Sequence, residues 1–146
     1  MKRFRFRLDQ VLRVRRLQLD QAKAALLGAN RDAHLAAARV EERLTEYATR
    51  SFPSGAQTYE SFERHLFLLD AAAGAVDVAR YDHRAALAVV EEKRGEWAVA
   101  QRRVSALERL EERRRTEHQI EMRRDEDRLV DDLVVARFNR SGPGGN

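Results

Sequence analysis

The residues of this sequence that could carry catalysis or metal binding are four histidines, His34, His65, His83 and His118. A helical carboxylate metal site would place a glutamate three positions before a histidine, and none of the four has one. The sequence also lacks the nucleotide-binding motifs GxGxxG and GxxxxGK and the zinc protease motif HExxH. We therefore predict that the protein is not an enzyme and uses no cofactor or metal.

Phosphate binding is the other chemistry that the composition raises, because arginines are frequent. The triplet Arg113 to Arg115 could contact phosphates, but three nearby glutamates neutralise it: Glu111, Glu112 and Glu117. Residues 1–16 hold seven basic residues and one acid, whereas the rest of the chain has 21 basic and 23 acidic residues. This distribution favours a short basic tip that meets an acidic partner or a membrane surface, and it disfavours a nucleic-acid binder.

The composition indicates long helices rather than a broad core. Charged residues make up 36% of the chain, and aromatic residues only 7%. There is no cysteine, so neither disulfides nor thiolate metal sites can form. No apolar run long enough to cross a membrane or to form a signal peptide is present, so we expect a soluble, intracellular protein with no direct membrane insertion.

Apolar residues recur every seven positions in two stretches, which is typical of coiled coils. In each stretch a second seam position is occupied mostly by alanine, which predicts closely packed helices. The first stretch has Leu12, Leu19, Leu26, Ala33, Val40 and Tyr47, with Leu8, Ala22, Ala29 and Ala36 as companions. The second has Phe62, Leu69, Val76, His83, Val90, Trp97 and Val104, with Ala72, Ala79, Ala86, Ala100 and Leu107. His83 and Trp97 are therefore interpreted as seam-packing residues.

The segment Ala48 to Thr58 separates the two stretches and contains Pro53 and Gly55. We predict an all-α fold, an antiparallel two-helix coiled-coil hairpin whose long second helix extends beyond the first. Residues 1–140 would form this single hairpin, with helices over about 8–49 and 59–139, a hinge over about 50–58, and a disordered tail at 141–146. Equal spacing from residue 53 would place Leu12 near Trp97 and Phe4 near Val104.

In this register, residues after about Leu107 have no partner helix within the chain. The segment 108–128 is mostly charged, and pairs three or four residues apart would stabilise a solvated helix there. A later apolar cluster suggests a binding partner: Leu129, Val130, Leu133, Val134 and Phe138. Near the hinge, Phe67 and Leu68 fall outside the seam. They either form a docking patch or are capped by the loop that contains Phe52.

Two terminal signatures resemble the FliJ family, the coiled-coil component of the flagellar type III export apparatus. The first is "FRFRLDQVLRVRRLQLDQAKAAL" at residues 4–26, and the second is "LERLEERRRTEHQIEMRRDEDRLVDDL" at residues 107–133. Val130 stands where the family pattern commonly has leucine. The resemblance runs from Phe4 to about Arg140 and includes a hinge at a similar place.

The resemblance implies a non-enzymatic protein, cytoplasmic and peripherally associated with the export apparatus at the inner membrane. FliJ proteins are similar in architecture to the central stalks of rotary ATPases, and their partners are the export ATPase FliI, the export gate protein FlhA and export chaperones. By this likeness, the ATPase-contact candidates are Phe4, Phe6, Arg113, Arg114, Arg115, Arg123 and Arg124. The candidates for contact with the gate or chaperones are Tyr47, Phe62, Leu66, Phe67 and Leu68.

Two other interpretations remain open on the residues alone. One is a generic coiled-coil scaffold or oligomerisation protein, homodimeric through its charged C-terminal segment. The other is a binder of nucleic acid or anionic membranes that acts through residues 1–16, whose binding would depend strongly on salt.

Overall fold

A computed structural model of the chain describes residues 3–50, 55, 57–140 and 142. It contains two helices, α1 (Asp9–Thr49, 41 residues) and α2 (Tyr59–Arg140, 82 residues), and no strand among the described residues. The predicted fold class, all-α with two helices of which the second is longer, is confirmed. The predicted disordered tail, apart from Gly142, lies outside the described residues, as do Phe52 and Pro53.

Local polar contacts explain where the helices begin. At the start of α2, Thr58 is the N-cap: the backbone N–H of Ser61 donates to its Oγ1 at 3.3 Å, which satisfies a free donor of the first turn. At the start of α1, the carboxylate of Asp9 lies in the first turn, where the helix dipole favours negative charge. Asp9 also forms an ion pair with Arg13 at 3.0 Å.

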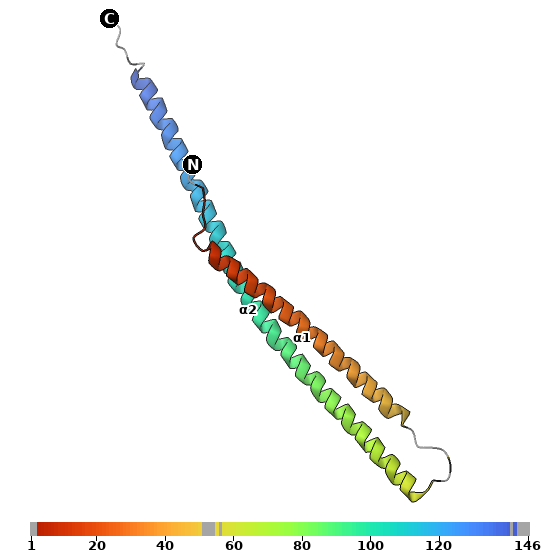
Figure 1. The fold of residues 1–146 in the computed structure, drawn as a ribbon. Helices are drawn as coiled ribbons and strands as arrows, with labels where there is room; N and C mark the ends of the chain where they lie inside the picture. The colour runs from red at the N-terminus through yellow and green to blue at the C-terminus, as the bar shows by residue number, and fades with distance from the viewer. Residues whose placement is uncertain (1–2, 51–54, 56, 141, 143–146) are drawn as a thin grey trace. The chain divides into compact units, whose positions relative to one another are not determined.

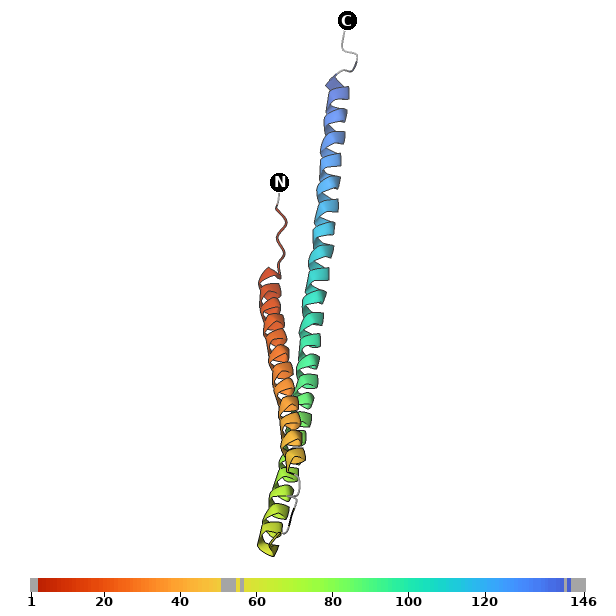
Figure 2. The ribbon, with the colours of Figure 1, turned by 90° about the vertical axis from the view of Figure 1, so that its right-hand side faces the viewer.

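The chain packs as two compact units. The hairpin unit comprises residues 17–101, and the terminal unit comprises residues 1–16 and 102–146. Within the hairpin unit, α1 and α2 run antiparallel and side by side (Figures 1 and 2).

The core of the hairpin unit is a narrow seam of small residues. Ala29, Ala33 and Val90 form a buried cluster, and Leu26 and Ala86 pack against it. The short alanine side chains allow the two backbones to approach closely. All the buried apolar residues within the described helices occupy predicted seam positions: Leu12, Ala29, Ala33, Ala36, Val76, Ala79, Val90 and Val104. The heptad assignment is therefore confirmed for these residues.

The register between the helices differs from the prediction. Equal spacing from residue 53 would set Ala33 opposite the region of Val76, but Ala33 packs in the cluster of Val90. The end of α1 faces Ala73 and Val76 instead, through Leu44 and Tyr47. The first three turns of α2 therefore precede the part that faces α1. The register is displaced because the first turns of α2 extend past the end of α1.

Candidate functional site

Residues 3–8, which we call the strap, are not helical and precede α1 in the terminal unit. Residues 3–6 have no regular structure, residues 7 and 8 lie in a turn, and exposed residues alternate with more buried ones along the strap. Phe4 and Leu8 are half-buried and Phe6 is only 8% exposed, whereas the three arginines between and before them are exposed: Arg3, Arg5 and Arg7. The strap therefore has an apolar inner side and a basic outer side.

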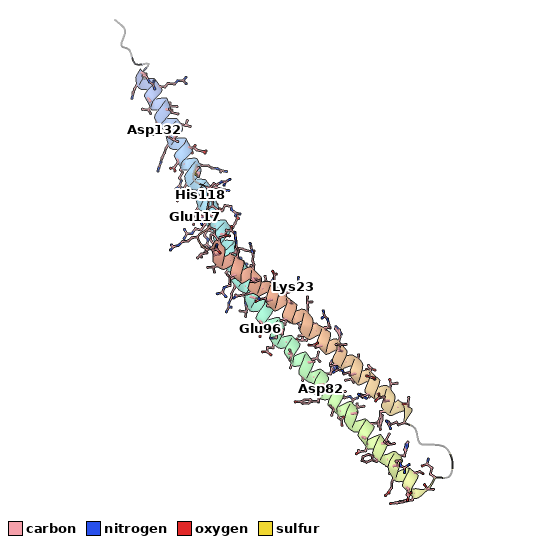
Figure 3. All side chains as sticks on the ribbon, in the orientation of Figure 1. Lys23, Asp82, Glu96, Glu117, His118 and Asp132 are labelled. Carbon is pink, nitrogen blue, oxygen red and sulfur yellow. The ribbon has the colours of Figure 1, made fainter. Side chains whose placement is uncertain are left out.

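The inner side of the strap rests on α2. The ring of Phe4 meets the imidazole of His118 edge-on, with 5.7 Å between ring centroids. The guanidinium of Arg115 lies over the same ring, 5.6 Å from its centroid, in a cation–π contact. Figure 3 labels His118 and its neighbour Glu117 on α2, which locates this contact.

This contact corrects two predictions. Phe4 lies at Arg115 and His118 rather than near Val104, because the displaced register carries through to the terminal unit. The charged segment after Leu107, which was predicted to have no partner helix, also makes contacts within the chain. Arg16 of α1 forms an ion pair with Glu108 at 3.0 Å, and the strap borders α2 between Leu110 and Glu121.

Ion pairs along α2 support the predicted solvated helix. Arg115 binds Glu111 at 3.0 Å and Glu112 at 3.5 Å, and Arg114 binds Glu117 at 3.1 Å. Each such pair contributes about 0.2–0.5 kcal/mol to helix stability. The Arg128 to Asp125 distance, 3.7 Å, marks a looser pair.

The ATPase-contact candidates fall into two groups. Phe6, on the inner side of the strap, is buried, Phe4 is half-buried, and Arg114 and Arg115 form ion pairs with glutamates. The remaining three are exposed and form no ion pair within the described part of the chain: Arg113, Arg123 and Arg124. Arg114 and Arg115 are exposed as well, but their guanidinium groups are paired with glutamates.

Near the hinge, the gate or chaperone candidates are all exposed. Phe67 is 72% exposed, and the others are between 40% and 43% exposed: Tyr47, Phe62, Leu66 and Leu68. Sequence reasoning missed Tyr59, the first residue of α2, which is 75% exposed. The sequence places Tyr59 directly after Thr58 and just before the apolar residues near the hinge, and this position could have identified it. We call Tyr59, Phe62, Leu66, Phe67 and Leu68 the hinge patch.

The predicted C-terminal apolar cluster is exposed in the terminal unit. Its side chains are 57–79% exposed once Val135 is included: Leu129, Val130, Leu133, Val134, Val135 and Phe138. Figure 3 labels Asp132 among them. Apolar residues gathered on a solvated helix in this way make the segment a candidate interaction surface.

One titratable group with a shifted pKa lies in α1. The pKa of Arg43 is raised by the hydrogen bond that its guanidinium donates to Glu46 and by the charge of that carboxylate. The described residues contain no group of three or more His, Cys, Asp or Glu placed to hold a metal ion. None of the helices in the described ranges is long and apolar enough to span a membrane.

Comparison with protein families decides the assignment. The family model described as flagellar FliJ protein matches residues 4–143. The chain belongs to the FliJ family. The match includes residues 4–8 of the strap, both helices and the two terminal signatures. Membership makes this FliJ-family chain a component of flagellar type III export. Comparisons with curated proteins and with solved structures gave no match.

Proposed function

We propose that this chain acts as a central stalk of the export apparatus, a non-enzymatic protein that binds the export ATPase ring and links it to the export gate and to chaperones. Residues 1–140 would work as one helical hairpin, in the cytoplasm and peripherally at the inner membrane. The observation that carries the proposal is the presence of two separate sets of exposed side chains, one near each end of α2. A linking protein requires two such surfaces.

We assign the ATPase contact to the terminal unit. Its exposed arginines are Arg113, Arg123 and Arg124, and the last two come shortly before the exposed apolar residues 129–138 on α2. Charged residues around apolar ones suit a protein that must bind a ring and still turn or slip within it. The engaged candidates Phe4, Phe6, Arg114 and Arg115 would shape this surface rather than contact the ring first.

The test of this contact is stimulation of the purified ATPase. Replacing Arg113, Arg123 and Arg124 by alanine should reduce the stimulation at least about tenfold. The matched control removes three other exposed arginines of α2, at positions 84, 102 and 103, and should retain the stimulation. Equal activity of the two triple variants would refute the assignment.

We assign gate or chaperone binding to the hinge patch together with Tyr47. The double change Phe67→Ser and Leu68→Ser should abolish capture of the gate protein or a chaperone. Val78→Ser with Tyr81→Ser is the matched control, because these side chains are 61% and 66% exposed on the same helix. Gate binding that survives the first change, or is lost with the second, would count against the hinge patch.

Self-association is a second candidate function, favoured by the exposed apolar residues 129–138. A scaffold of this kind would sediment as a dimer that Leu133→Ser and Phe138→Ser dissociate. A monomer at all concentrations would eliminate it.

A further inference from the structure

A second row of apolar and small residues runs along α2, outside the seam that faces α1. Its members are spaced alternately by three and four residues, as in a coiled-coil seam. We call this row the outer stripe: Ala71, Gly74, Val78, Tyr81, Ala85 and Ala88. All six are exposed, and two of them, Val78 and Tyr81, have large side chains. The outer stripe covers about 27 Å of helix within the hairpin unit, and none of its residues is buried by the described part of the chain.

The glycine of the outer stripe has no role in packing within the hairpin. A Cβ added at Gly74 would meet nothing within 4 Å. Glycine inside a helix is less favourable than alanine, because it loses more backbone freedom on folding. Close contacts within the chain therefore do not explain this residue, whereas a helix laid along the outer stripe would use the open space above it.

The charges beside the outer stripe decide which helix it fits. Asp77 and Arg84 lie along the same edge of the stripe, one directly before Val78 and the other directly before Ala85. Both charged residues are exposed, and they form no ion pair within the described residues. If two identical stripes pair antiparallel with Val78 opposite Tyr81, Asp77 of each copy lies beside Arg84 of the other. This edge is therefore complementary to itself.

The direction of pairing matters for these charges. A parallel copy in register would place Asp77 of one copy beside Asp82 of the other, which is a like charge. Figure 3 labels Asp82 on this part of α2. In the antiparallel pair, Asp70 meets Glu91 on the same edge, but Glu91 is already paired with Arg94 at 2.8 Å. The charges thus favour the antiparallel arrangement.

We propose that two copies of this chain associate antiparallel through their outer stripes, so that α2 of one hairpin unit packs on α2 of the other. Val78 and Tyr81 meet at the centre, and the alanines and Gly74 let the two backbones approach closely. The contact uses neither the hinge patch nor residues 129–138. Loss of this dimer should therefore leave gate capture and stimulation of the ATPase unchanged.

The test is the dissociation constant of the dimer, measured on the full-length protein by sedimentation equilibrium at low salt. Asp77→Arg and Arg84→Asp should each raise it at least about tenfold, because each change turns two symmetry-related attractions into repulsions. The double variant restores opposite charges and should return to within about threefold of the unmodified protein. Asp20→Arg, which makes the same change at an exposed position of α1, should have less than about a twofold effect.

Two further variants test the geometry. Gly74→Gln fills the open space above the stripe, so the dimer should weaken at least about tenfold while the circular dichroism of the helices is retained. The direction can be read from disulfide formation, because the chain has no cysteine of its own. A mixture of Val78→Cys and Tyr81→Cys should cross-link faster than either variant alone. Faster cross-linking of Val78→Cys with itself would overturn the antiparallel direction.

Two results would overturn the proposal as a whole. One is a protein that stays monomeric at every concentration. The other is a dimer that keeps its affinity in Asp77→Arg and Gly74→Gln but is lost with Leu133→Ser and Phe138→Ser, because that result would place the contact in residues 129–138.

Discussion

Phe6→Ala should release the strap from α2 without unfolding the helices. Phe6 is 8% exposed, and burial of a phenylalanine side chain stabilises a protein by about 1.5–3 kcal/mol. The strap also has Phe4 as an anchor, so we expect its docking to lose about 2 kcal/mol. A loss of that size raises the population of the open strap roughly 30-fold.

Limited trypsin digestion reports this population, because cleavage after Arg5 or Arg7 requires a segment that can enter the protease. The N-terminal peptides should appear about 30-fold faster from Phe6→Ala than from the unmodified protein, as followed by mass spectrometry. Circular dichroism at 222 nm should stay the same, because the strap is not helical.

Phe67→Ala is the control, since its side chain is 72% exposed and its removal should change the stability by less than about 0.5 kcal/mol. If the N-terminal peptides appeared at equal rates from both variants, the strap would not be held by Phe6. Loss of helical signal in Phe6→Ala would show instead that the side chain supports the whole terminal unit.

Other perturbations test the helices themselves. Val90→Ala removes two methyl groups from the seam cluster, so the free energy of unfolding measured with urea should fall by about 2 kcal/mol. Thr58→Ala removes the cap of α2 and should cost about 1 kcal/mol by the same measurement, whereas Thr58→Ser should retain most of it. Gly95→Ala should raise the free energy of unfolding by about 0.5–1 kcal/mol, because an added Cβ meets nothing within 4 Å; a loss of stability would contradict this. Arg16→Ala should cost at most about 1 kcal/mol, and the difference should vanish in 1 M salt, because both partners of the Glu108 pair are about half-exposed.

The candidate surfaces were predictable to different degrees. Exposure of Phe67 and of the residues around Leu133 follows from their positions off the seam, since a two-helix seam is too narrow to bury them. Burial of Phe6 was not predicted, because residues 3–8 were interpreted as a basic tip for a partner. The alternation of arginine with Phe4, Phe6 and Leu8 was the available signal, but a run of six residues does not say what its apolar side will cover.

The two helices, their heptad seams and the family follow from the amino-acid sequence, because they depend on local periodicity and on signatures that can be recognised along the chain. Which residues meet across the seam follows from the packing of the two helices and could not be predicted from the pattern. A heptad pattern repeats, so sliding one helix by two heptads still sets apolar positions against one another, and the length of the connection does not choose between these registers. Packing of Ala29 and Ala33 with Val90, and of Phe4 with His118, selects one of them, and with it the side of α2 that the strap covers.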